Sequence, residues 1–191
     1  MTIQELFIAS NQALQKSIGQ IADDQWDIAM PPGMSRKPGT LKDAVRYHTY
    51  DDAWVPDVLA GKTKAEVGDT YEPLLTAEED IRENYDKYNR RAVDAVSDFQ
   101  DLDKTTHLSY GDFPARDYIQ HIISFRAFRS YDIAKLIGAD TTMDAGFVRA
   151  LLDEFSPVIE GYRQMGVFPP ALEVPDDASP QAKLLAMVGR E

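Results

Sequence analysis

The histidines are the side chains of this sequence best suited to metal binding or acid–base chemistry, because the chain contains no cysteine. They are His48, His107 and His121. Zinc and similar ions need three or four nitrogen, oxygen or sulfur ligands, which helices supply as pairs three or four residues apart. No two histidines have that spacing, although Asp51 or Asp52 could pair with His48, and Asp117 with His121. We interpret these pairs as carboxylates that orient or salt-bridge partly exposed imidazoles, so the spacing predicts no metal site.

The elements that must position these side chains are helices. Apolar residues recur with helical spacing in four long segments, near residues 2–20, 40–60, 76–99 and 114–138. Thr2 and Thr40 are suited to cap the first two segments, whereas Gly61 and Gly138 are suited to end the second and the fourth. The fourth segment is apolar on nearly all sides, and we therefore expect it to be the most deeply buried.

Other local signals define the remaining elements. Pro56 should kink the second helix or mark where it restarts, and Thr76 with Glu79 predicts a capping box at the start of the third. Residues 105–111 are too short for a sheet, although 106–110 could be extended. A fifth helix is expected at 145–165, followed by an extended tail and a short helix opened by Ser179 and Pro180. We predict an all-α fold, an antiparallel four-helix bundle with an additional C-terminal helix and an extended tail. It forms one domain, with its core in residues 1–140 and the C-terminal helix and tail in 141–191.

Length and charge restrict the classes of function. The 191 residues suit one compact domain, and 32 acidic against 20 basic residues give a net charge of −12. This charge repels phosphate backbones and anionic lipid head groups, so we expect neither nucleic acid nor a membrane as a partner. The absence of cysteine excludes disulfides and thiolate ligands, and no signal peptide or membrane-spanning run is visible. We therefore expect a cytoplasmic protein.

Three blocks of sequence resemble the DinB-like, mycothiol-dependent maleylpyruvate isomerase superfamily of actinobacteria. The first block is TLKDAV at 40–45 with AWVPDVLAG at 53–61. The second is THLSYGDFPA at 106–115 with YDIAK at 131–135 and Gly138. The third is GVF at 166–168 with VPDDASP at 174–180, a Leu pair at 184–185 and Gly189-Arg190. Together the blocks cover nearly the whole chain. The resemblance implies a four-helix bundle of the DinB-like type.

Catalytic members of that family hold a divalent metal, which activates a thiol. The resemblance implies one histidine ligand on the second helix and a carboxylate and histidine four residues apart on the fourth. In this sequence the three ligand positions fall on Tyr47, Phe125 and Arg129, which are non-ligands or very poor ones. His48 lies one residue beyond the first position and is the only residual metal candidate. The resemblance therefore implies a substituted metal site and no resident cofactor, with mycothiol as a conceivable cosubstrate.

The same alignment defines a candidate ligand cavity in the bundle, lined by Tyr47, His48, Asp51, Phe125 and Arg129. A buried guanidinium without a partner costs several kcal/mol, so Arg129 should face Tyr47, Asp51 or Asp132. A structural network is one reading of Arg129. The other reading is that it points into the bundle, substitutes for the absent metal cation and holds an anionic ligand.

Arg126 lies one turn before Arg129. We interpret Arg126 as an interhelical salt bridge or a surface residue whose stem alone is buried.

Three hypotheses of function follow. The first is a DinB-like relative that has lost its metal site and binds a small anionic molecule through Arg129, Tyr47 and His48. The second is an active mycothiol-dependent isomerase or S-transferase, with a rearranged metal site or with His48 as the base. The third is a non-catalytic structural module that forms a homodimer through its helix faces.

Overall fold

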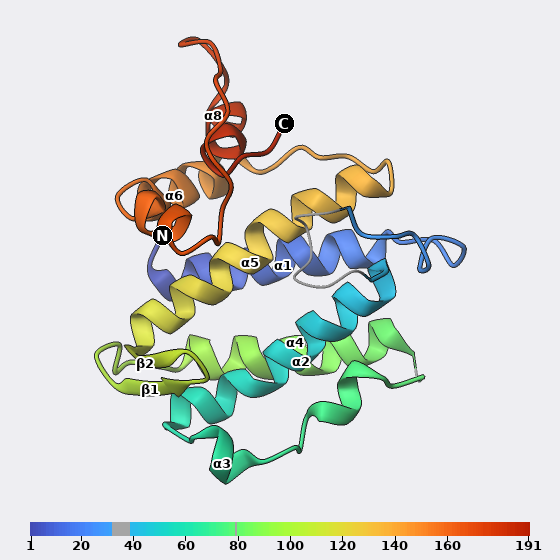
Figure 1. Ribbon diagram of the computed structural model, residues 1–191, viewed down its shortest axis with the longest axis vertical. Coiled ribbons are helices and arrows are strands. Elements are labelled where there is room, and N and C mark those ends of the chain that lie inside the picture. The colour runs from blue at the N-terminus through green and yellow to red at the C-terminus, as the bar shows by residue number, and fades with distance from the viewer. Residues whose placement is uncertain (32–38, 79) are drawn as a thin grey trace. The chain divides into compact units, whose positions relative to one another are not determined.

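The computed structural model describes residues 1–31, 39–78 and 80–191, and most of them lie in helices (Figure 1). The elements in chain order are α1 (Ile3–Gly19), α2 (Leu41–Ala60), α3 (Lys64–Val67), the 3₁₀ helix η1 (Glu72–Leu75), α4 (Ile81–Ser97), β1 (Thr105–Leu108), β2 (Gly111–Pro114), α5 (Ala115–Leu136), α6 (Ala145–Phe155), α7 (Ile159–Gln164) and α8 (Pro180–Met187). The predicted all-α class is confirmed, apart from one short hairpin. None of the helices in these described ranges is long and apolar enough to cross a membrane.

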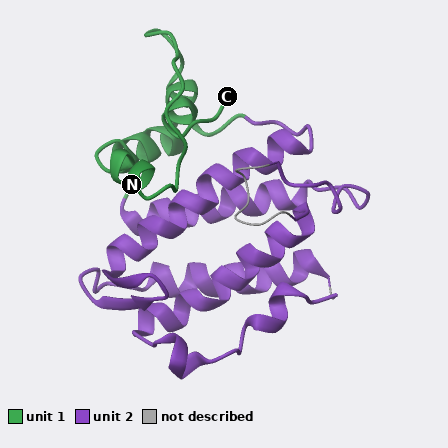
Figure 2. Ribbon diagram, in the orientation of Figure 1, with its two compact units in different colours: residues 1, 142–191 green, residues 2–141 purple. Residues whose placement is uncertain are grey.

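The chain divides into two compact units, residues Thr2–Thr141 and residues Thr142–Glu191 with Met1 (Figure 2). We call them the N-terminal unit and the C-terminal unit. Within the N-terminal unit, α1 packs along α5, α2 packs along α4, and α1 also contacts α4 (Figure 1). Helix α5 is the most deeply buried of the four long helices, as its apolar sequence predicted.

Local capping explains where the first long helices begin and end. The side chains of Thr2 and Thr40 each form a capping box, with Glu5 and Asp43 respectively, as their positions predicted. Gly61 follows α2 in the left-handed region at φ 86°, a conformation that a side chain would strain. Helix α2 runs through Pro56 without restarting.

The predicted start of the third long helix is wrong. Helix α4 begins at Ile81, and the Asp80 carboxylate caps it by accepting from the backbone N–H groups of Arg82 (2.9 Å) and Glu83 (3.2 Å). Thr76 instead follows η1, where its N–H donates to the Pro73 carbonyl, and it lies four residues before the Asp80 cap of α4. Glu79, the other half of the predicted capping box, lies outside the described residues.

Strands β1 and β2 form an antiparallel hairpin, whereas the sequence favoured a single extended segment. Leu108 pairs with Gly111, so only two residues connect the strands and pairing is purely local. The Thr106 hydroxyl also donates to the Phe113 carbonyl at 2.8 Å. The hairpin contacts α2 and α5, which supplies the packing that two isolated strands would lack.

One end of the core of the N-terminal unit is apolar. We call it the apolar layer: Leu14, Ile18, Ile21, Met30, Leu41, Val45, Tyr85 and Ile133. Each of these side chains is at most 7 % exposed, and they come from all four long helices and the segment after α1. Burial of such side chains stabilises a fold by about 25 cal/mol for each Å² removed from water.

The C-terminal unit corrects the prediction of one fifth helix at 145–165. Helix α6 ends at Phe155 and α7 begins at Ile159, because Pro157 has no N–H to continue the ladder. Rings of the unit pack against each other, with centroids 5.9 Å apart for Phe155 and Tyr162 and 5.8 Å apart for Tyr162 and Phe168. Ser179 caps α8 through the N–H of Ala182, as predicted.

Candidate functional site

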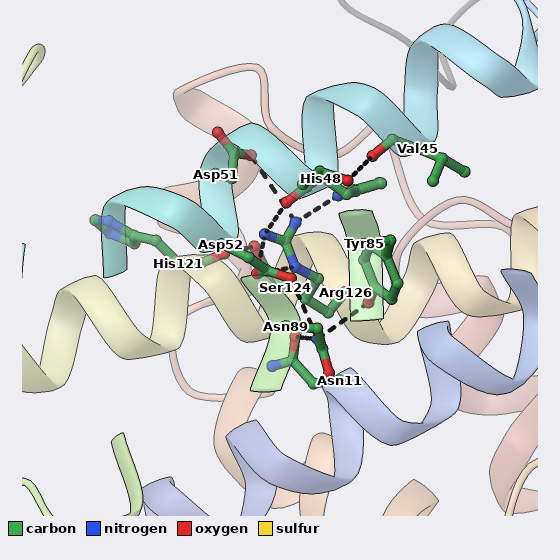
Figure 3. A network of polar contacts seen from close by, with 11 residues as sticks. Asn11, Val45, His48, Asp51, Asp52, Tyr85, Asn89, His121, Ser124 and Arg126 are labelled. Carbon is green, nitrogen blue, oxygen red and sulfur yellow. Dashed lines mark hydrogen bonds and ion pairs between the residues drawn. The ribbon is translucent and has the colours of Figure 1, made fainter. Parts of the chain in front are cut away.

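A network of buried polar side chains connects the four long helices of the N-terminal unit (Figure 3). We call it the polar layer: Asn11 from α1, His48 and Asp52 from α2, Tyr85 and Asn89 from α4, and Arg126 from α5. All six are at most 6 % exposed. Each long helix therefore contributes at least one polar group to a single hydrogen-bonded system.

Arg126 is the centre of the polar layer and is fully buried. Its Nη2 lies 2.7 Å and its Nε 3.2 Å from Oδ1 of Asp52. Nη2 also donates to the backbone carbonyl of His48 (3.3 Å), and Nη1 lies 3.9 Å from Oδ2 of Asp51. Burial by itself lowers the pKa of Arg126, but the negative charges of Asp52 and Asp51 outweigh it and raise that pKa. The guanidinium is thus permanently charged and held by α2.

His48 is a neutral imidazole in this setting. Its burial lowers its pKa well below the usual 6.5, and the positive charges of Arg126 and Arg129 lower it further. Nη1 of Arg126 contacts Nδ1 of His48. Because a guanidinium can only donate, Nδ1 must accept, and the single ring proton must reside on Nε2. His48 therefore offers a hydrogen-bond donor at Nε2.

The second half of the polar layer is organised by Asn89. Its amide nitrogen lies 2.7 Å from Oδ1 of Asn11, 3.2 Å from Oδ2 of Asp52 and 3.1 Å from the Tyr85 hydroxyl. Asn11 in turn donates to the Phe7 carbonyl at 3.0 Å. Burial, followed by the nearby charge of Asp52, raises the pKa of Tyr85 well above 10. Both oxygens of Asp52 thus have donors, one from α5 and one from α4.

The five predicted cavity residues lie in different environments. His48 belongs to the polar layer, and Asp51 lies at its edge with its side chain 24 % exposed. Tyr47 is 46 % exposed and Phe125 is half-buried. The side chain of Arg129 is 16 % exposed, and its Nη1 lies 3.5 Å from Oδ2 of the buried Asp132. The structure therefore brings His48 and Asp51 together and leaves Tyr47 at the surface.

The central cation is Arg126 and not Arg129. Three residues turn a helix by about 300°, so Arg129 points about 60° away from the direction in which Arg126 reaches α2. Arg126 forms an interhelical salt bridge, which is one of the two roles that its sequence position suggested.

No three histidine, aspartate or glutamate side chains in the described part of the chain come together so that they could hold a metal ion. His48, the residual metal candidate, has Nδ1 bonded to a cation instead. The donor set between α2 and α5 therefore does not fit a metal site of the kind that the family resemblance implies.

Sequence reasoning missed Asn11 and Asn89. The signal that could have found them is a polar residue inside an apolar stripe: Asn11 lies four residues after Phe7, and Asn89 lies four residues after Tyr85. A polar side chain at such a position must be buried, and a buried polar group needs a partner. Two interrupted stripes on different helices therefore predict a polar contact between them.

Comparison with known protein families, with curated proteins and with solved structures gives no match for this chain. The resemblance to the DinB-like family thus depends on the three blocks of sequence alone.

Proposed function

We propose that this chain is a cytoplasmic, DinB-like four-helix bundle protein of the maleylpyruvate isomerase-like type that binds a small anionic molecule between α2 and α5 without a metal. The pairing of α1 with α5 and of α2 with α4 is compatible with such a bundle. Helices α2 and α5 approach each other less closely than the members of these pairs, and Arg126 bridges them with a long side chain. The guanidinium of Arg129, one turn further along α5, would supply the positive charge that the family obtains from a metal.

The observation that carries the proposal is the contact between Nη1 of Arg126 and Nδ1 of His48. This Nδ1 accepts from Arg126, which leaves Nε2–H as a donor. Arg129 is near enough for its charge to lower the pKa of His48, and it is a permanent donor. A carboxylate accepts hydrogen bonds only, so a neutral N–H beside a guanidinium is complementary to it.

The same observation weakens the enzymatic alternative. A general base needs a ring nitrogen without a proton, and in this arrangement the only such nitrogen is already bonded to Arg126. A mycothiol-dependent isomerase or S-transferase that used His48 as base would first have to displace the guanidinium from its buried carboxylate.

A second candidate function, a structural or dimerisation module, is favoured by a different observation. Every nitrogen of the Arg126 guanidinium has an acceptor within the protein. Closed networks of this kind can specify one packing of helices without binding any ligand.

Thermal unfolding with carboxylates separates the two candidates. Maleate and a panel of other mono- and dicarboxylates at near-neutral pH should raise the unfolding temperature of the wild type, because a ligand that binds only the folded state stabilises it. Arg129→Ala should abolish this rise. Arg90→Ala, a change at an exposed position on α4, should preserve it. If none of the carboxylates stabilised the wild type, the anion-binding proposal would be excluded and the structural module would remain.

A further inference from the structure

A row of aromatic rings runs across the surface from α2 to α4, on a face of α2 different from that of the polar layer. We call it the aromatic ladder: Tyr47, Tyr50, Trp54, Tyr71 and Tyr88. Successive ring centroids are 6.1, 6.2, 5.5 and 6.4 Å apart. The first three rings share one face of α2, because residues three, four and seven apart align on a helix.

The ladder is not part of the apolar core. Tyr47 is 46 % exposed, and Tyr50, Trp54 and Tyr88 are half-buried. Of the five rings, only Tyr71, the fourth in the row, is buried. The ladder therefore presents connected aromatic surface to solvent, most of all at Tyr47.

Carboxylates border these rings. The Tyr50 hydroxyl donates to Glu72 at 3.2 Å. The Tyr71 hydroxyl donates to Asp57 at 2.8 Å, but Lys62 already forms an ion pair with this carboxylate at 2.7 Å. Asp51 lies one helical turn from Tyr47 on the same side of α2. Ring faces are negative, and the net charge of the chain is −12. The end of the ladder at Tyr47 and Tyr50, beside Asp51 and Glu72, therefore favours a cation.

The chain already uses one end of the ladder in this way. Nζ of Lys87 lies 5.3 Å and Cζ of Arg91 5.4 Å from the centroid of the Tyr88 ring, within the range of cation–π attraction. The opposite end, at Tyr47, is the more exposed one. A cation from another molecule can reach that end.

We propose that the aromatic ladder is a docking surface for an arginine-rich segment of a partner protein. Guanidinium groups stack on Tyr47 and Tyr50, and Asp51 lies beside them to accept hydrogen bonds. Arginine fits better than lysine, because its planar guanidinium can stack on a ring while its edge binds a carboxylate in two places. This surface borders the anion site proposed between α2 and α5, because Asp51 also lies at the edge of the polar layer. The two proposals are tested separately, the anion site with carboxylates and Arg129→Ala, and the docking surface with peptides and Tyr47→Leu.

Calorimetric titration with oligo-arginine and oligo-lysine peptides of equal length tests the proposal. At physiological ionic strength, wild type should bind the arginine peptide at least about threefold more tightly than the lysine peptide. Tyr47→Leu should weaken binding of the arginine peptide by about threefold and reduce its advantage over lysine. Tyr110→Leu is the matched control, because this tyrosine is 58 % exposed on the hairpin, outside the ladder.

Backbone amide chemical shifts during the titration should move at residues 47–54 and around Tyr71. If the two peptides bound with equal affinity, the net negative charge of the protein alone would account for their binding, and the proposal would be overturned. Absence of binding, or equal losses in Tyr47→Leu and Tyr110→Leu, would also overturn it.

Discussion

The apolar layer and the polar layer are built by the same four helices, about one or two turns apart. Helix α1 contributes Leu14 to the first and Asn11 to the second, and α2 contributes Val45 and then His48. Side chains of both layers are buried to a similar degree. In the apolar layer burial itself stabilises the fold, whereas in the polar layer burial is unfavourable until every group has a partner. Substitutions in the two layers should therefore destabilise the fold for different reasons, lost burial in one and an unpaired buried group in the other.

Tyr85 belongs to both layers and shows how they join. Its ring packs in the apolar layer, while its hydroxyl bonds with Asn89 in the polar layer. A single tyrosine can thus connect apolar packing, through its ring, with polar packing, through its hydroxyl. Because the polar layer has defined partners, it restricts which rotation of each helix is acceptable, which an apolar layer does less strictly.

The largest loss of stability should come from Asp52→Asn in the polar layer, because this substitution removes a charge without changing the side-chain volume. Arg126 would keep only Asp51, at 3.9 Å, as a carboxylate neighbour. Removing one partner of a buried ion pair typically costs about 3–5 kcal/mol. Urea unfolding should show a loss of that size in the free energy of unfolding. A loss below about 1 kcal/mol would show that the buried pair is not electrostatically essential.

A double substitution separates the missing charge from the lost contacts. Asp52→Leu with Arg126→Met should be much less destabilised than the sum of the two single changes, because no unpaired charge remains. Additive losses would contradict this account.

Leu14→Ala tests the apolar layer. Leu14 is fully buried, and its truncation should cost about 2–5 kcal/mol through lost burial and a residual cavity. This loss should be the same at every pH between about 5 and 8, because neither leucine nor alanine titrates in that range. Urea unfolding at several pH values would measure it, and a pH-dependent difference from wild type would show coupling to the polar layer.

The sequence could predict the features of the fold that depend on local interactions, and not those that depend on how two helices pack. The caps at Thr2 and Thr40 depend on atoms three residues apart, so their residue types were enough. The bond from Arg126 to Asp52 joins residues 74 positions apart and depends on the relative rotation of two helices. Periodicity within a single helix does not contain that rotation. The choice of Arg129 as the central cation came instead from its alignment with a metal-ligand position of the resembled family. Pro157, in contrast, is a local signal for the end of α6. The apolar spacing that continues beyond it favoured one uninterrupted helix instead.

Stability at acid pH should distinguish the layers through His48. The pKa of His48 is depressed in the folded state, so below about pH 6.5 the unfolded chain binds a proton that the folded chain does not. Stability is then fully present above pH 6.5 and lost as the pH falls, by at most about 1.4 kcal/mol for each pH unit. Burial also lowers the pKa of His121, which adds in the same direction.

His48→Gln should flatten part of this slope, measured as the free energy of unfolding between about pH 7 and pH 5. An unchanged slope in His48→Gln would show that this histidine is not held neutral by its surroundings.

The smallest effect should come from the same chemical change at the surface, Asp27→Asn. Asp27 Oδ1 lies 3.2 Å from Nζ of Lys42, a distance comparable to that of the buried pair, but these side chains are 82 % and 32 % exposed. Water solvates both charges whether or not they meet, and holding two mobile side chains together costs entropy, so such pairs contribute about 0.2–1 kcal/mol. The free energy of unfolding should therefore fall by less than about 1 kcal/mol, and added salt should reduce even this loss, because exposed charges are screened. The loss in Asp52→Asn should change little with salt, since Asp52 and Arg126 are fully buried. If both variants lost similar amounts and responded alike to salt, burial would not be what makes the polar layer different, and the contrast between the two layers would fail.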